Sequence, residues 1–192
     1  MLEKFKITLA SQSPRRHELL AGLDIKFSIE ANKDEEEVYN EDIPSNQVPE
    51  FLARHKSESF HRKLEKNEIL ITADTLVFCK NEILGKPKDR KDAENILAKL
   101  SGEKHQVLTG VALRSNYTFR SFTSTTEVTF KKLSNDEIKY YLDNYKPYDK
   151  AGAYGVQEWI GYIGITSIKG SYFNVMGLPV QKLYTELMNF NI

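Results

Sequence analysis

One aspartate interrupts the longest apolar stretch of the chain. The run EILITADTLVFCK is almost entirely apolar and β-branched, and Asp74 lies in its middle, beside Thr75. A carboxylate in such surroundings is costly unless it is hydrogen-bonded, paired with a cation or bound to a metal. The alternative is that the strand ends at Thr72 and Asp74 begins a solvated loop, but TLVFC resumes the strand pattern at once. We therefore expect Asp74 to hold a metal ion or to accept a proton from water.

A run of acidic residues is a second candidate for metal chemistry. Residues 34–37 read DEEE and lie in a polar stretch that predicts a loop. Carboxylates are the hard oxygen ligands that Mg²⁺ and Mn²⁺ prefer. A charge run by itself is more often a solvated surface. It becomes a candidate metal site only together with Asp74, because a divalent ion needs more than one carboxylate.

Basic residues stand at positions where an anion could bind. In LASQSPRRHELL, Pro14 suits the first position of a helix. Arg15 and Arg16 follow it, although cations in a first helical turn oppose the helix dipole. A phosphate would resolve this conflict. Lys56, on a predicted helix, and Lys86, in LGKP, are surface lysines if taken singly, but the four cations together could bind a triphosphate.

A glycine-rich stretch near the C-terminal end could bind a base. In DKAGAYGVQ the small residues allow the backbone to approach a ligand closely. Gln157 carries a donor and an acceptor on one amide, which match the N3–H and O4 of uracil or thymine. A glycine-rich packing corner explains the same stretch equally well.

The elements that must position these residues alternate between strands and helices. Strand patterns are followed by helical ones, and a long hairpin flanks the residues NY. The predicted strands cover 5–11, 26–31, 68–80, 105–115 and 118–133. The first predicted helix runs from Pro14 to about Gly22, and the second starts near Pro49 and continues through KLEK. Asp89 is expected to cap the third helix, the capping box SNDE at Ser134 to open the fourth, and Pro179 to begin the last, with Tyr184 facing inward. Residues 146–177, with most of the ten glycines, predict loops and short strands. We expect one domain over residues 1–192 with a mixed β-sheet and flanking helices, in the α/β class.

Composition excludes several classes of function. Equal numbers of basic and acidic residues, 27 each, give no field that would attract nucleic acid or a membrane surface. The four histidines lack metal-ligand spacing, and neither a P-loop nor a dinucleotide-binding motif is present. No apolar run approaches a transmembrane length, and no signal-peptide pattern is visible. With Cys79 as the single cysteine, we expect a cytoplasmic protein.

Six motifs in order resemble the Maf proteins, nucleotide pyrophosphatases once called septum formation inhibitors. They are LASQSPRR, ADT, GKP, LSG…H…V.TG, DKAGAYGVQ and GSYFNVMGLP. The resemblance runs from Ile7 to the final helix. It implies a metal-dependent enzyme that splits a nucleoside triphosphate into the monophosphate and pyrophosphate. It also implies an ITPase-like fold of two lobes around a deep cleft, often as a homodimer.

The resemblance also assigns roles to individual residues. The branch of the family that acts on dTTP, UTP and modified pyrimidine nucleotides carries three specificity residues, which fall on Arg15, Thr75 and Gln157. The proton-accepting aspartate falls on Asp74, which would hold Mg²⁺ or Mn²⁺ together with a glutamate at Glu36. The phosphate-binding lysines fall on Lys56 and Lys86. Glu158 and Trp159 follow Gln157, where the family usually has glycine.

Two alternatives to a dTTP/UTP pyrophosphatase stay open. The first is the 7-methyl-GTP branch of the family, which Thr75 and Gln157 disfavour. The second is a non-catalytic nucleotide sensor that regulates cell division through a partner. Intact Asp74 and Glu36 argue against a sensor, which does not need a water-activating carboxylate.

Overall fold

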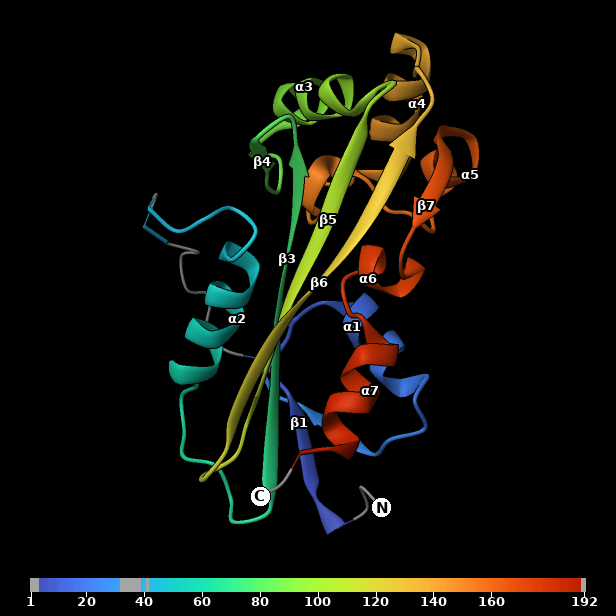
Figure 1. The fold of residues 1–192 in the computed structure, drawn as a ribbon. Helices are drawn as coiled ribbons and strands as arrows, with labels where there is room; N and C mark the ends of the chain where they lie inside the picture. The colour runs from blue at the N-terminus through green and yellow to red at the C-terminus, as the bar shows by residue number, and fades with distance from the viewer. Residues whose placement is uncertain (1–3, 32–38, 41, 191–192) are drawn as a thin grey trace. The chain divides into compact units, whose positions relative to one another are not determined.

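The computed structural model describes residues 4–31, 39–40 and 42–190 (Figure 1). The chain divides into two compact units. Unit 1 comprises residues 1–74, 109–124 and 177–192, and unit 2 comprises residues 75–108 and 125–176. Three long strands contribute residues to both units: β3 (Glu68–Cys79), β5 (Lys104–Arg114) and β6 (Phe119–Phe130).

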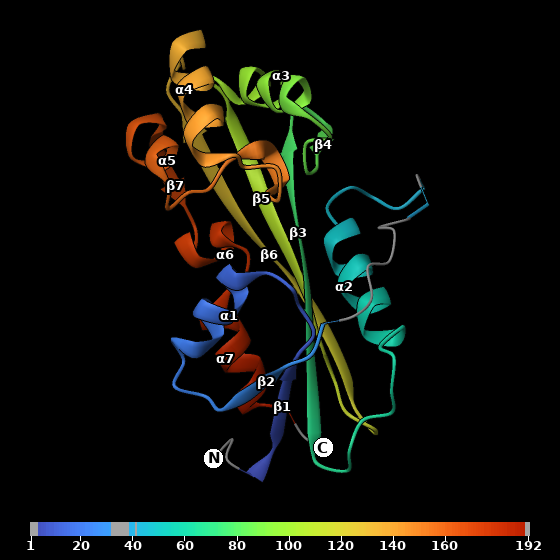
Figure 2. The same cartoon turned by 180° about the vertical axis from the view of Figure 1, so that it is seen from behind.

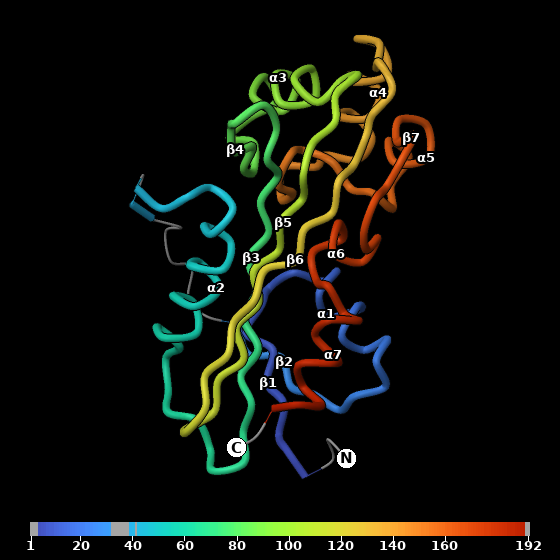
Figure 3. The backbone as a smooth tube through the Cα atoms, viewed as in Figure 1, coloured from blue at the N-terminus to red at the C-terminus, as the bar shows by residue number. Residues whose placement is uncertain are grey.

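The described strands form one mixed sheet. Its order is β2-β1-β3-β5-β6-β7, with β4 paired to β3, and Figure 3 traces the chain through it. β1 (Lys6–Leu9) is parallel to both β2 (Phe27–Ile29) and β3. β4 (Glu82–Leu84) is antiparallel to β3, and β7 (Ile165–Lys169) is antiparallel to β6. The predicted mixed α/β fold with flanking helices is confirmed.

Unit 1 has helices on both faces of its part of the sheet. α1 (Pro14–Ala21) and α7 (Val180–Met188) lie side by side on one face, and α2 (Val48–Glu58) covers the other (Figures 1 and 2). α2 approaches β5 closely because residue 110 is glycine. A Cβ atom there would lie 2.2 Å from the carbonyl carbon of Pro49. The backbone of α2 therefore rests directly on the strand.

Unit 2 packs its helices around a separate apolar core. They are α3 (Arg90–Leu100), α4 (Asn135–Tyr145), α5 (Trp159–Gly164) and α6 (Tyr172–Met176). Asp89 accepts a hydrogen bond from the N–H of Asp92 at 2.8 Å, as its predicted capping role requires. Ser134 and Glu137 form the capping box that SNDE predicts.

Three predictions about these elements were wrong. The second helix ends at Glu58 rather than continuing through KLEK, because Phe60 turns inward to pack against Ala10 and Leu70. The stretch 146–177 contains β7 but also the helices α5 and α6, which are too short to show a helical period. Tyr184, expected inside, is 45% exposed.

No helix in the described part of the chain is long and apolar enough to cross a membrane.

Candidate functional site

Asp74 lies inside an unbroken strand. β3 continues from Glu68 to Cys79 without a loop, so the alternative in which the strand ends at Thr72 is wrong. Only 4% of Asp74 is exposed. Lys56 of α2 donates a hydrogen bond from Nζ to Asp74 Oδ1, which forms an ion pair within unit 1. The cation that a buried carboxylate requires is thus supplied by a residue predicted to bind phosphate.

A second contact fixes the distance between α2 and β3. The hydroxyl of Thr72 donates to the carbonyl oxygen of Ala53 at 2.6 Å, and both groups are buried. Thr72 and Asp74 share one face of the strand, since side chains alternate with a period of two. Ala53 and Lys56 share one face of the helix, since they are three residues apart. The contact therefore places Lys56 opposite Asp74.

Arg16 binds the backbone beside Asp74. Its Nε donates to the carbonyl oxygen of Gly177 at 2.8 Å, and its Nη1 donates to that of Ala73 at 2.9 Å. These carbonyls give a structural reason for a cation in the first turn of α1, where the sequence predicts a phosphate. Arg15, one residue earlier, is half-buried. Within unit 1 the structure thus groups Arg16, Lys56 and Asp74 around the middle of β3.

In unit 2, Gly152 joins three segments that carry predicted site residues. Its N–H donates to the carbonyl oxygen of Gly85 at 3.0 Å, and its φ is +71°. A Cβ atom on Gly152 would lie 2.8 Å from Cγ2 of Val77, so the backbone packs directly against β3. Along the chain, the predicted residue Thr75 lies two positions before Val77, Lys86 one position after Gly85, and Gln157 five positions after Gly152.

Gln157 offers a hydrogen-bond acceptor that the described residues do not use. Its side-chain Oε1 is buried and has no hydrogen-bond partner in the described part of the chain. A buried amide oxygen without a partner is costly, and such atoms occur where a ligand completes the hydrogen bonding. This geometry is compatible with recognition of a base.

The described residues do not form a complete metal site by themselves. No group of three or more His, Cys, Asp or Glu side chains that could hold a metal occurs among residues 4–31, 39–40 and 42–190. The acidic run at 34–37, with Glu36, lies outside the described residues. Asp74 has the hard oxygen chemistry that fits Mg²⁺ or Mn²⁺, but the remaining ligands would have to come from Glu36, phosphate oxygens and water.

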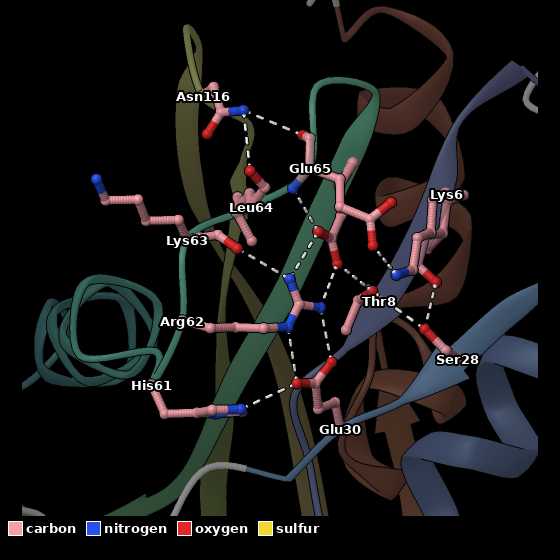
Figure 4. A network of polar contacts seen from close by, with 12 residues as sticks. Lys6, Thr8, Ser28, Glu30, His61, Arg62, Lys63, Leu64, Glu65 and Asn116 are labelled. Carbon is pink, nitrogen blue, oxygen red and sulfur yellow. Dashed lines mark hydrogen bonds and ion pairs between the residues drawn. The ribbon is translucent and has the colours of Figure 1, made fainter.

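An ionic network around one buried glutamate of unit 1 is not among the features that the sequence predicts (Figure 4). Arg62 binds both oxygens of Glu30, at 2.8 and 2.7 Å, and both oxygens of the fully buried Glu68, at 2.9 and 2.7 Å. Burial alone would raise the pKa of Glu68. Hydrogen bonds from Arg62, the Glu65 N–H and the Thr8 hydroxyl outweigh burial and lower this pKa to about 2. One feature of the sequence could have indicated this network: Glu68, a charged residue, opens the most apolar run of the chain and needs a cation there.

Comparison with known proteins places the chain in one family. A family model described as Maf-like protein matches residues 6–190. A dTTP/UTP pyrophosphatase of Phocaeicola vulgatus is 52% identical over 97% of this chain and 96% of its own length. A relative of the same name from Porphyromonas gingivalis is 52% identical over 98% of this chain and 96% of its own length. Another, from Flavobacterium psychrophilum, is 50% identical over 97% of this chain and 95% of its own length. A solved HAM1 protein from Coxiella burnetii aligns over 97% of this chain and 100% of its own chain. Its sequence identity of 16% and TM-score of 0.48 are too low to assign a fold.

Proposed function

Because this chain belongs to the Maf family, we propose that it is a nucleoside triphosphate pyrophosphatase that hydrolyses dTTP and UTP to the monophosphate and pyrophosphate. One observation carries the proposal: relatives about half identical over nearly the whole chain are named dTTP/UTP pyrophosphatase. The unsatisfied, buried Oε1 of Gln157 supports the choice of a pyrimidine base. Thr75 and Arg15 complete the proposed specificity residues.

In the proposed reaction, water attacks the α-phosphorus and pyrophosphate leaves. Asp74 accepts a proton from the attacking water, since it is a carboxylate held in a fixed place within β3. Lys56 lies beside Asp74, where it can both pair with the carboxylate and approach phosphate. Lys86 and Arg15 add positive charge against the triphosphate. Arg16 donates a hydrogen bond to the carbonyl oxygen of Ala73, so its role in the reaction includes fixing the residue before Asp74.

A divalent cation, Mg²⁺ or Mn²⁺, is part of the proposal. Asp74 and Glu36 would hold it, and its chemistry would be to neutralise charge on the phosphates. The support is the family membership and the oxygen chemistry of these two side chains.

We also propose that residues 1–192 act as one catalytic domain in the cytoplasm, with a nucleotide as partner rather than nucleic acid. Support for one domain is that β3, β5 and β6 each belong to both units. A homodimer and a deep substrate cleft are family expectations and stay predictions here.

The test is release of pyrophosphate from dTTP, UTP, CTP, GTP and 7-methyl-GTP, with Mg²⁺, with Mn²⁺ and with EDTA. We expect metal-dependent turnover of dTTP and UTP, at least tenfold above the other nucleotides. Turnover of 7-methyl-GTP instead would retain the chemistry and reject the pyrimidine assignment. Binding of UTP with no pyrophosphate release would support the nucleotide-sensor alternative. Activity that survives EDTA would reject the metal.

A further inference from the structure

Glu158, the residue after Gln157, is bound by two side chains of unit 2. The hydroxyl of Tyr141 donates a hydrogen bond to Glu158 Oε2. Nζ of Lys150 lies 3.1 Å from Glu158 Oε1 and also 2.8 Å from Oδ1 of Asp149. Tyr141 is fully buried, and the side chains of Lys150 and Glu158 are only 11% and 19% exposed. An ion pair this sheltered is weakly screened by solvent, so it constrains its members more than a surface pair does.

The same tyrosine hydroxyl also holds the other end of the turn that contains Gln157. Tyr141 accepts a hydrogen bond from the N–H of Gly155 at 3.0 Å. The N–H of Glu158 donates to the carbonyl oxygen of Gly155 at 3.0 Å, which closes a four-residue turn. Gln157 is the third residue of this turn. Both ends of the turn are therefore attached to one buried oxygen atom.

Packing leaves the turn little room to move. A Cβ atom on Gly155 would lie 2.7 Å from Cδ of Glu158, so the carboxylate packs against bare backbone. A Cβ atom on Gly161 would lie 1.9 Å from the carbonyl oxygen of Val156, so the first turn of α5 packs against the residue before Gln157. Burial and the bond to Glu158 raise the pKa of Tyr141, which therefore stays a donor at neutral pH.

We propose that Glu158 is a positioning residue that fixes the backbone turn carrying Gln157 and thereby contributes to the selectivity for uracil and thymine over cytosine. Glu158 acts together with Tyr141, Lys150 and Gly155. We call these four residues the Glu158 cluster. The inference rests on the proposed function of Gln157 and adds the residues that make its recognition selective.

The physical reason lies in the symmetry of an amide. Uracil presents an acceptor at O4 and a donor at N3, whereas cytosine presents a donor at N4 and an acceptor at N3. A glutamine that rotates its amide by half a turn exchanges its own donor and acceptor and fits the other base. Selectivity therefore requires an amide held in one orientation on a fixed backbone. The Glu158 cluster supplies the fixed backbone.

The experiment compares the ratio of kcat/KM for UTP and for CTP across variants. We expect this ratio to fall at least tenfold in Glu158→Ala and in Tyr141→Phe, and less in Lys150→Met. Glu158→Gln retains an acceptor for the Tyr141 hydroxyl and should restore part of the ratio. Glu127→Ala, which removes the ion pair between half-buried Glu127 and exposed Lys104 in the same unit, is the control and should leave the ratio unchanged.

The outcomes separate the inference from the proposed function. If the Glu158 variants lose thermal stability, or lose the same rate on UTP and on CTP, while the ratio of kcat/KM stays unchanged, Glu158 has only a structural role. That outcome would overturn this inference and leave the proposed function standing. A wild-type protein that does not distinguish UTP from CTP would overturn both. If turnover is absent altogether, the comparison uses the ratio of the Kd values for UTP and CTP instead. These are measured by quenching of the fluorescence of Trp159, the single tryptophan of the chain, which follows Glu158.

Discussion

At the scale of single residues, the environment of Asp74 determines what it can do. The carboxylate is nearly enclosed and is bound by the ammonium of Lys56. A hydroxyl of Thr72 ties α2 to the same strand face two residues earlier. These contacts hold the carboxylate in place before any substrate binds, and a preorganised base is what proton transfer needs.

Asp74→Asn should abolish most activity and leave the fold intact. An amide has nearly the same shape but cannot accept the proton from water, so we expect kcat on UTP to fall by at least about 100-fold. The measurements are pyrophosphate release and thermal unfolding. Asp136→Asn, an exposed acid in the first turn of α4, is the control. Unchanged turnover in Asp74→Asn would remove Asp74 from the mechanism.

His105 is a second residue whose surroundings make a measurable difference. It is 2% exposed, and its Nε2 lies 2.8 Å from the hydroxyl of the buried Tyr154. Burial lowers the pKa of His105 to about 4, so the imidazole is neutral in the folded protein at neutral pH. A neutral histidine inside a core of aromatic rings favours a structural role over a catalytic one.

The free energy of unfolding should depend on pH through His105. Between about pH 6.5 and pH 4 the unfolded chain binds the proton and the folded protein does not, so stability falls as the pH falls, by up to about 3 kcal/mol. Urea denaturation at several pH values measures this slope. His105→Gln should lose most of the slope. Tyr154→Phe should lower stability but keep the slope, and a slope shared by wild type and His105→Gln would contradict the assignment.

At the scale of elements, the Arg62 network joins the start of β3 to the end of β2. Arg62 lies in the segment after α2 and binds Glu68 of β3 and Glu30, which follows β2 (Figure 4). The helix that the sequence predicts through this segment would carry Arg62 away from both carboxylates. The end of α2 at Glu58 is therefore linked to the presence of a buried glutamate 10 positions later in the chain.

Arg62→Met should destabilise the protein strongly. The substitution leaves the Glu68 carboxylate buried without its cation, and such a change costs about 3 to 5 kcal/mol. The measurement is urea denaturation at pH 7. Lys6→Met removes the exposed ion pair with Glu65 at the edge of the same network and should have little effect. Equal, small effects of both variants would show that Glu68 does not depend on Arg62.

At the scale of the whole molecule, three strands belong to both units. β3, β5 and β6 each leave one unit and enter the other without a break. A strand that loses its partners in one unit loses part of its support in the other, because a ladder of hydrogen bonds forms cooperatively along the strand. The units are thus coupled through the chain itself.

Unfolding should therefore be a single transition. Trp159, the single tryptophan, lies in unit 2, whereas Arg62 lies in unit 1. We expect Arg62→Met to move the transition of Trp159 fluorescence to lower urea by the same amount as the far-UV circular dichroism transition. A fluorescence transition that stays in place while the dichroism shifts would show that the units unfold separately.

The sequence by itself determined the features that depend on neighbouring residues. The cap at Asp89, the capping box at Ser134, the boundaries of α1 and the central position of Asp74 in a strand all follow from patterns a few residues long. The six motifs identified the family because their order along the chain is itself sequence information.

Tertiary structure decided which distant groups meet. Arg16 binds carbonyls 57 and 161 positions away, and Lys56 finds Asp74 across 18 positions. Tyr141, in α4, holds the turn that contains Gln157. No local pattern contains these partners, because a buried polar group takes whichever donor or acceptor the packed backbone brings within hydrogen-bond distance.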